Sequence, residues 1–308
     1  MFELTFLGTS ASAPSIRRGL SAQIVKHDEY RFLVDCGEGT QRQILQSGEG
    51  FKRLHRVLLT HGHLDHILGL GGLLSTLMRW EALDELEVFG SKETLSRVHD
   101  LLYGVVLRGK KPQTKLYLRE ITPGIIFETK KFTVTAFSVN HRGAGCLGYK
   151  FEEKSHRPFL ADKADALGIP FGPERRDLVN GKSITLPNGT RVTPDDVLGE
   201  ALKGTSLAIT GDTGRTDNLL EICQELDALV IESTYIHQDL DMAHKFGHLT
   251  ARQAAELAKA AGVKQLILTH LSRRYRERDL LNEARAIFPN TRVARDFDTY
   301  SIKRENHG

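Results

Sequence analysis

Cysteine is scarce in this sequence, and the spacing of the few cysteines argues against a disulfide framework. Only three occur among 308 residues, at Cys36, Cys146 and Cys223, and no two form a Cys-x-x-Cys pair. Their odd number and wide separation also argue against a thiolate metal site. We therefore expect three buried, reduced thiols, because free cysteine packs as a small hydrophobic residue.

Long hydrophobic runs are also missing. Nowhere do about 18 apolar residues follow one another, which is the length that a membrane-spanning helix needs. The chain begins with the strand-like segment Phe2–Leu7 rather than with a basic and apolar secretion signal. We therefore expect a cytoplasmic protein with no membrane partner. The net charge of +3 is compatible with a nucleic-acid partner but does not indicate one.

Short strands alternate with helices over most of the chain, which predicts an α/β protein with helices covering the sheet faces. Apolar runs bounded by turn residues predict strands at Phe2–Leu7, Ser21–Val25, Tyr30–Val34, Arg56–Leu59, Leu86–Phe89, Ser206–Ile209, Ala228–Ile231 and Gln265–Leu268. Helices are expected at Gly39–Gln46, from His66 through Leu77, and at Lys92–Leu102, Asp217–Glu225, Thr250–Gly262 and Arg278–Ile287. Thr250 and Gln253 have the spacing of a capping box.

The middle of the chain has a different character. Residues 151–203 are rich in glycine, proline and charge, and the stretches GIPFGP and LPNGT are turn signals. Nine basic residues there are balanced by nine acidic ones, counted from Lys150 to Lys203. We expect a flexible arm at 151–203, inserted into a single domain that spans 1–308.

Three histidines and an aspartate follow directly after the apolar strand Arg56–Leu59. They are His61, His63, Asp65 and His66. Imidazole and carboxylate groups suit zinc, and a tight loop at a strand end can present several of them to one point. His61 and His63 alternate whereas Asp65 and His66 are adjacent, so the loop can aim two pairs at different cations. A solvated turn that holds these residues by chance is the alternative.

Further metal ligands must come from elsewhere, and three other apolar strands end in suitable residues. FTVTAFSVNH ends in His141, SLAITGD ends in Asp212 and KQLILTH ends in His270. Taken singly, each residue has another explanation, since either histidine could be a capped one and Asp212 could be a helix N-cap. Together with the histidine loop they predict a two-metal site at one edge of a sheet.

This order of motifs resembles the metallo-β-lactamase superfamily. The resemblance rests on the HxHxDH loop, on the preceding Asp35-Cys36-Gly37-Glu38-Gly39, and on the three later strand ends. It implies a four-layer αβ/βα sandwich that binds two Zn²⁺ per subunit. By the same resemblance, one zinc is held by His61, His63 and His141, and the other by Asp65, His66 and His270. Asp212 would bridge the two, and Asp35 would support the site from behind.

Three further segments resemble the ribonuclease Z family within that superfamily. Glu232 and His248, with Thr250, match a pair in which a carboxylate orients a histidine that acts as general acid. THLSRRYRER matches the family's H-x-S-x-R-Y pattern and indicates Arg274 as the preferred phosphate-binding arginine. The arm resembles the family's tRNA-binding exosite, with candidate residues Gly172, Pro173, Arg175 and Arg176.

The resemblance implies an endoribonuclease that removes the 3′ trailer from precursor tRNA, in a family whose members are commonly homodimers. A metal-bound hydroxide, oriented and deprotonated with the help of Asp65, would attack the phosphodiester, and His248, held by Glu232, would protonate the leaving oxygen. The products would be a tRNA 3′-hydroxyl and a 5′-phosphorylated trailer. Pro14–Gly19 departs from the family's Pro-x-Lys-x-Arg-Asn loop, which is associated with sensing the CCA end, so the cut position stays open.

Two alternatives remain at this point. A related hydrolase of small molecules, such as a cyclic phosphodiester or a lactone, would keep the metal ligands but would have no need of the arm. A non-catalytic RNA-binding protein of the same fold is disfavoured, because every expected ligand position is intact. The arm and the ligands therefore favour an RNA-cleaving enzyme.

Overall fold

The strands assemble into two large sheets in the computed structural model, which describes residues 1–304. The strands of the sheets span Phe2–Gly8 (β1), Ala22–His27 (β2), Tyr30–Val34 (β3), Arg56–Leu58 (β4), Glu85–Gly90 (β5), Lys115–Glu120 (β6), Gly124–Glu128 (β7), Phe132–Ser138 (β8), Leu147–Glu153 (β9), Ser206–Ile209 (β12), Ala228–Glu232 (β13), Leu266–Thr269 (β14), Thr291–Val293 (β15) and Thr299–Ile302 (β16). One seven-stranded sheet has the order β16-β1-β2-β3-β4-β5-β6, and the other has the order β15-β14-β13-β12-β9-β8-β7.

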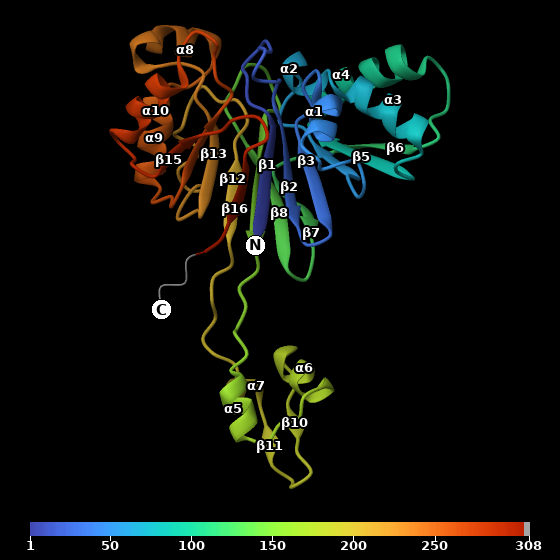
Figure 1. Ribbon diagram of the computed structural model, residues 1–308, viewed down its shortest axis with the longest axis vertical. Coiled ribbons are helices and arrows are strands. Elements are labelled where there is room, and N and C mark those ends of the chain that lie inside the picture. Colours follow the sequence, from blue (N-terminus) through green and yellow to red (C-terminus); the bar gives the residue numbers. More distant parts are fainter. Residues whose placement is uncertain (305–308) are drawn as a thin grey trace. The chain divides into compact units, whose positions relative to one another are not determined.

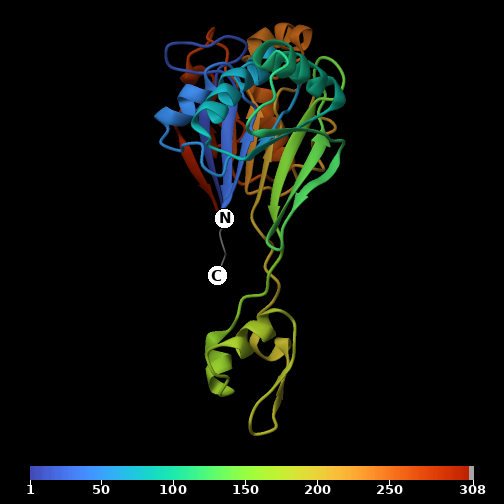
Figure 2. The same cartoon turned by 90° about the vertical axis from the view of Figure 1, so that its right-hand side faces the viewer.

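Helices cover the outer face of each sheet (Figures 1 and 2). They span Thr40–Gln46 (α1), Leu64–Ile67 (α2), Leu70–Trp80 (α3), Lys92–His99 (α4), Leu240–Phe246 (α8), Ala251–Ala260 (α9) and Glu277–Arg285 (α10), with a π-helix at Asp100–Leu107 (η1) and a 3-10 helix at His237–Asp239 (η2). Ile44, Leu73 and Val98 belong to the cluster that joins α1, α3 and α4 to the first sheet. Ala254 and Leu280 belong to the corresponding cluster beneath α9 and α10 on the second sheet.

A third apolar cluster fills the space between the two sheets. Phe2 and Phe132 meet edge to face with ring centroids 5.7 Å apart, and the centroids of Phe32 and Phe151 are 5.6 Å apart. This offset geometry is favoured by the charge distribution of aromatic rings. With helices outside both sheets, the layers run helix, sheet, sheet, helix. The predicted α/β class and the four-layer αβ/βα sandwich are confirmed.

One of the expected helices is wrong. Asp217–Glu225 forms successive turns rather than a helix. The Leu219 amide donates to Thr216 across three residues, whereas the Cys223 amide donates to Leu219 across four, so the bonds do not repeat as a helical ladder requires. The helix expected at Lys92–Leu102 is an α-helix through His99, and from Asp100 it continues as the π-helix η1.

The helix expected from His66 through Leu77 is interrupted and becomes α2 and α3. Gly69 causes the interruption, because its amide donates to the Cys36 carbonyl at 2.9 Å instead of continuing the ladder. A Cβ atom at Gly69 would lie 2.0 Å from the Gly37 carbonyl oxygen, so only glycine fits this contact. At this interruption, the hydrogen bond from Gly69 to Cys36 connects the helical segment after the histidine loop to the loop that follows β3.

The expected state of the three cysteines is confirmed, since Cys36, Cys146 and Cys223 are all buried and unpaired. Burial raises the pKa of Cys146 to about 11 and that of Cys223 to about 12, so both remain protonated thiols at neutral pH. Within residues 1–304, no helix has the length and apolar character needed to cross a membrane.

The chain divides into two compact units, and unit 2 is the insertion Glu153–Gly204. Its elements are Ala161–Ala166 (α5), Pro173–Val179 (α6), Ile184–Thr185 (β10), Arg191–Val192 (β11) and Pro194–Val197 (α7). Buried Ile169, Leu178 and Val197 belong to a small apolar core within this unit. Unit 2 therefore has packing of its own, and its role as an RNA-binding arm stays a prediction.

Unit 1 comprises Met1–Glu152 and the chain from Thr205 onward, and it contains both sheets. β3, β4 and β5 are parallel neighbours in one sheet, and β12, β13 and β14 are parallel neighbours in the other. The carboxyl ends of parallel strands lie at one edge, where ligand-binding loops gather. The candidate residues lie at this edge. His61, His141, Asp212 and His270 come within three residues after β4, β8, β12 and β14, and Glu232 is the last residue of β13.

Candidate metal centre

The first group of expected ligands gathers where β4 and β8 end. The Nε2 atom of His61 lies 2.9 Å from Nδ1 of His63, and Nε2 of His141 lies 3.3 Å from the same Nδ1. One potential ligand atom each from His61, His63, His141 and Asp212 lies within 4.8 Å of the others. Such close approach of imidazole nitrogens suits a shared cation, since each neutral ring presents a lone pair.

The second group forms at the start of α2 and the end of β14. Asp65, His66 and His270 likewise place their potential ligand atoms within 4.8 Å of one another. Oδ2 of Asp212 lies 3.4 Å from Nε2 of His66 and 3.3 Å from Nε2 of His270. The same oxygen lies 3.8 Å from Nε2 of His61, so Asp212 stands between the two groups. All seven residues proposed from the sequence are thus brought together.

The polar atoms in this cluster fit divalent cations. Nε2 of His66 and Oδ1 of Asp212 are buried and have no hydrogen-bond partner within the described part of the chain. Buried polar groups without a partner are rare in folded proteins, and an ion is one of the explanations for them. Imidazole nitrogen and carboxylate oxygen together form a donor set that zinc prefers.

Four of the histidines are fixed through the ring nitrogen that faces away from the cluster. The partners of these Nδ1 atoms are Thr60 Oγ1 for His61 at 3.0 Å, Asp35 Oδ2 for His66 at 2.8 Å, the Gly247 carbonyl for His141 at 2.6 Å, and Thr234 Oγ1 for His270 at 3.0 Å. A hydrogen bond to Nδ1 leaves the Nε2 lone pair available to a metal and fixes the orientation of the ring.

The backbone is held in an unusual conformation at two points of the site. Asp35 has a φ angle of 60° and His270 has one of 54°, which is the left-handed region that residues other than glycine rarely occupy. Asp35 also accepts hydrogen bonds from the Thr60 amide at 2.8 Å and from its hydroxyl. Such strain clusters at functional sites, where the surrounding contacts maintain it.

The electrostatic environment favours neutral imidazoles in the first group and an ionised bridging carboxylate. Burial lowers the pKa of His61, His63 and His141, so these rings are in the metal-binding form at neutral pH. Burial would raise the pKa of Asp212, but the neighbouring His270 and His66 outweigh it and hold that pKa well below its usual range. Asp212 therefore remains a carboxylate.

A carboxylate–histidine pair adjoins the cluster. Glu232, the last residue of β13, is fully buried, and one of its oxygens lies 2.9 Å from Nδ1 of His248. The amides of Thr213 and Leu249 also donate to Glu232, at 2.8 and 3.1 Å. Burial would lower the pKa of His248, but Glu232 outweighs burial and raises the pKa to about 9. The pair can hold a proton on His248 beside the metal ligands.

Comparison with known proteins identifies the family. A ribonuclease Z of Bradyrhizobium sp. (strain ORS 278) is 46% identical over 98% of this chain and 100% of its own length. A ribonuclease Z of Geobacillus kaustophilus is 37% identical over 98% of this chain and 99% of its own length. The chain belongs to the ribonuclease Z family. It is therefore an endoribonuclease, an enzyme that hydrolyses phosphodiester bonds in RNA.

Family models and solved structures agree with the ribonuclease Z fold. A model described as Anti-Pycsar protein Apyc1 matches residues 2–162, and one described as Beta-lactamase superfamily domain matches residues 176–271. The crystal structure of human tRNase Z, short form, superposes with a TM-score of 0.70 at 25% identity, covering 98% of this chain and 100% of that chain. YhfI from Bacillus subtilis, at 17% identity and a TM-score of 0.68, shows the fold alone.

A cavity of about 590 Å³ opens over the cluster of candidate metal ligands. His63, Asp65, His141 and His248 line it, which brings the general-acid candidate and both ligand groups to one surface. Arg274, the arginine preferred from the sequence, lines the same cavity. The cavity can therefore receive a phosphodiester against the candidate metal ligands, with the positively charged side chain of Arg274 beside it.

The sequence missed several contributors to the ribonuclease Z site. Thr60 precedes His61 and Thr234 follows Glu232 by two residues, so a search for hydroxyls next to the motifs could have found both. The Gly247 carbonyl leaves no mark in a side-chain pattern. The sequence also does not indicate that Arg97 lines the cavity, because Arg97 lies on α4, well beyond the metal-ligand motifs along the chain.

Proposed function

We propose that this chain is a zinc-dependent endoribonuclease that removes the 3′ trailer from precursor tRNA. The observation that carries the proposal is the convergence of two ligand groups on Asp212 beside the Glu232–His248 pair. The similarity to human tRNase Z supports tRNA as the substrate. The cytoplasm, where precursor tRNA is found in bacteria, is the proposed location.

Each ligand group would hold one of two zinc ions per subunit. His61, His63 and His141 form the first set and Asp65, His66 and His270 the second, and the position of Asp212 between them supports a bridging role. Bound cations supply an activated water at neutral pH and neutralise charge on the phosphoryl oxygens. The histidine rings, fixed by their outer partners, would hold those cations in place.

The side chains around the centre would divide the proton transfers between them. Burial opposes ionisation of Asp65, but His270 outweighs it and lowers the pKa, so Asp65 is an acceptor that can orient the attacking water. His248 lines the cavity and can protonate the leaving 3′-oxygen, while Glu232 holds its ring. The products would be a tRNA 3′-hydroxyl and a trailer with a 5′-phosphate.

Substrate binding would involve both units. Arg274 is exposed in the cavity of unit 1 and is proposed to bind a substrate phosphate. Gly172, Pro173 and Arg176 of unit 2 are proposed as part of an exosite for tRNA, and Arg175 is proposed to hold that surface in place through Asp165 and the Ile169 carbonyl. A homodimer, in which the arm of one subunit presents RNA to the site of the other, is proposed from the family resemblance.

Cleavage of a labelled precursor tRNA tests the proposal. One substrate would carry an encoded CCA before the trailer and another would lack it, and bis(p-nitrophenyl) phosphate would be assayed in parallel. We expect cleavage of a precursor tRNA at the start of the trailer, with loss of activity in chelator. Hydrolysis of the small ester with both tRNA substrates left intact would contradict the tRNA assignment and favour a small-molecule hydrolase.

A further inference from the structure

Four arginines line the cavity over the metal-binding cluster. They are Arg97, Arg142, Arg273 and Arg274, and each is exposed. Among residues 1–304, Asp65 is the only acidic residue in the cavity wall, and none of the four guanidinium groups has a carboxylate within ion-pair distance. The cavity therefore carries more positive charge than one phosphodiester anion needs.

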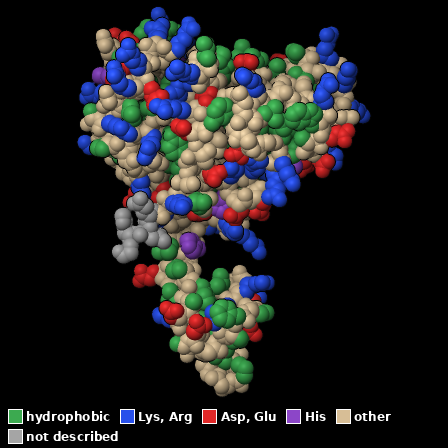
Figure 3. All heavy atoms as spheres, in the orientation of Figure 1, with side chains coloured by type: hydrophobic (Ala, Val, Ile, Leu, Met, Phe, Trp, Pro, Cys, Tyr) green, Lys and Arg blue, Asp and Glu red, His purple; other side chains and the backbone are tan. Residues whose placement is uncertain are grey.

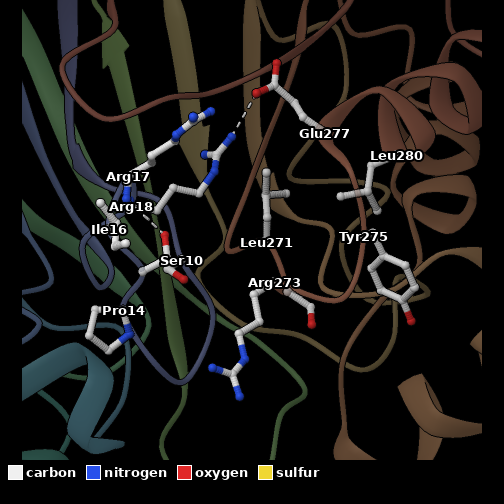
Figure 4. Close-up of a pocket in the computed structure, with 12 residues that line it drawn as sticks. Ser10, Pro14, Ile16, Arg17, Arg18, Leu271, Arg273, Tyr275, Glu277 and Leu280 are labelled. Carbon is white, nitrogen blue, oxygen red and sulfur yellow. Dashed lines mark hydrogen bonds and ion pairs between the residues drawn. The ribbon is translucent and has the colours of Figure 1, made fainter.

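In the adjoining cavity, by contrast, one of the arginines is paired with a carboxylate. This cavity has a volume of about 810 Å³ and shares Ser272 and Arg273 with the first cavity. There Arg18 donates to Glu277 at 3.0 Å, while the Arg273 side chain points away from that carboxylate (Figure 4). Over the visible face of the molecule, basic and acidic side chains are intermingled (Figure 3). The active-site cavity, whose arginines have no acidic partners in the part of the chain that the structure describes, thus differs from that mixed surface.

The four arginines belong to different sides of the centre. Arg273 and Arg274 follow His270, a residue of the second ligand group. Arg97 projects from α4, and its Nη1 donates to the Gly62 carbonyl at 2.7 Å, between two ligands of the first group. Arg142 directly follows His141 of the first group. The positive charge therefore extends past the metal-binding cluster on both sides.

Arg142 is held in place by contacts that leave part of its guanidinium free. Its carbon lies over the Phe246 ring at 5.1 Å from the centroid, and Nη2 donates to the Lys245 carbonyl. A Cβ atom at Gly247 would lie 3.1 Å from Cγ of Arg142, so the stem packs closely against this turn. Stacking and a single backbone bond fix the fork while its remaining N–H groups can bind an anion.

We propose that Arg97 and Arg142 form a second phosphate-binding site, on the His63–His141 side of the centre, for the phosphate next to the scissile one. This inference rests on the proposed function and deepens it, because it assigns the cavity to a polynucleotide with phosphates on both sides of the cut. Arg273 and Arg274 would hold the strand on the His270 side. A small phosphodiester has only one phosphate, so when it is bound at the centre it has no second phosphate for Arg97 and Arg142 to bind.

The test compares Arg97→Gln and Arg142→Gln with Arg292→Gln. Arg292 is an exposed arginine on β15 that lies outside both cavities, so it controls for the loss of one positive charge. We expect each cavity variant to raise KM for the precursor RNA by about tenfold, the effect of one lost charge-assisted hydrogen bond. We expect kcat and the hydrolysis of bis(p-nitrophenyl) phosphate to fall by much less than the affinity for the precursor RNA.

RNA affinity measured in chelator provides a readout that does not depend on turnover. Each cavity variant should weaken binding and reduce the slope of log affinity against log salt by about one phosphate contact, whereas Arg292→Gln should not. Lysine at either position should restore part of the affinity and of the slope.

Two results would overturn the second phosphate site. One is RNA binding by both cavity variants that matches Arg292→Gln in affinity and salt slope. The other is a parallel loss of small-ester hydrolysis, which would mean that Arg97 acts on the histidine loop through Gly62 and that Arg142 acts on the turn at Lys245–Gly247. If the wild-type protein leaves precursor tRNA uncut, the proposed function fails, and the affinities in chelator still decide the second phosphate site.

Discussion

At the scale of single residues, the carboxylate of Asp35 controls one ligand of each proposed cation. It accepts from Nδ1 of His66 directly and from the Thr60 hydroxyl, whose oxygen in turn lies 3.0 Å from Nδ1 of His61. Both rings are thereby fixed with Nε2 turned toward Asp212. A residue that touches no cation position itself can thus determine the affinity of the centre.

Replacing Asp35 by asparagine should weaken zinc binding. Asparagine tolerates the left-handed backbone found here, so the loop should be retained, but its amide group cannot accept the same hydrogen bonds. Loss of such an outer partner lowers metal affinity by about 10-fold to 100-fold. Competition with a chromogenic chelator measures this affinity. His248→Gln is the control, because this variant should lose activity while keeping its affinity for zinc. Equal zinc affinity in Asp35→Asn and wild type would disprove the role of Asp35.

The residues of the centre were predictable from the sequence to different degrees. The histidine loop stands out because three histidines in six positions after an apolar strand are rare. Asp212 and His270 could be added because each ends an apolar strand. The outer partners could not, since a backbone carbonyl such as that of Gly247 is the same in every residue.

At the scale of elements, the apolar periodicity and the capping residues of the sequence predicted helices and strands that the structure contains. The capping box at Thr250 and Gln253 is present and begins α9. The helix expected at Asp217–Glu225 is wrong because Leu219 and Cys223 are buried in successive turns, a pattern that the sequence alone cannot distinguish from a helix. β6 and β7 escaped prediction because much of each strand is exposed and shows little apolar alternation.

One carboxylate ties the loop after α1 to the first sheet and should make stability depend on pH. Glu49 accepts from Lys26 at 2.8 Å, from Thr5 at 3.1 Å and from Arg31. Burial would raise the pKa of Glu49, but Lys26 and Arg31 outweigh it and lower the pKa. Because the folded-state pKa lies below the unfolded one, the stabilisation is present above the unfolded pKa and is lost as pH falls through the folded pKa.

Glu49→Gln should therefore lower the free energy of unfolding by about 1 kcal/mol at pH 7. The difference from wild type should shrink as the pH falls below about 4.3, the ordinary pKa of glutamate, and should vanish only below the lower folded-state pKa, where both proteins carry a neutral side chain at this position. Urea unfolding in chelator at both pH values measures it without interference from metal release. An equal difference at pH 7 and at low pH would contradict the ion-pair account.

At the scale of the whole molecule, the composition of unit 2 could not predict which of its charged side chains are exposed to a ligand. Its charges balance, yet its two adjacent arginines have different environments. The Arg175 side chain is 11% exposed, contacts Asp165 and donates to the Ile169 carbonyl at 2.7 Å. Arg176 is exposed. The structure therefore separates a side chain that holds unit 2 together from one that is free to meet a ligand.

Arg176→Glu should weaken binding of precursor tRNA by about tenfold while leaving stability unchanged, because it reverses an exposed charge that would face phosphate. Arg175→Gln should instead destabilise unit 2. Fluorescence anisotropy with labelled precursor tRNA, together with limited proteolysis, distinguishes the two. If Arg176→Glu bound RNA as tightly as wild type, Arg176 would have no place in the exosite.

Two-metal cleavage of precursor tRNA is tested most directly by mapping the ends that wild type and Asp212→Ala produce. Wild-type protein loaded with zinc should release a tRNA with a 3′-hydroxyl and a trailer with a 5′-phosphate. Asp212→Ala, which removes the carboxylate shared by both ligand groups, should lower the rate by about a thousandfold or more. Full activity in Asp212→Ala, or an uncut precursor tRNA with wild-type protein, would contradict the account.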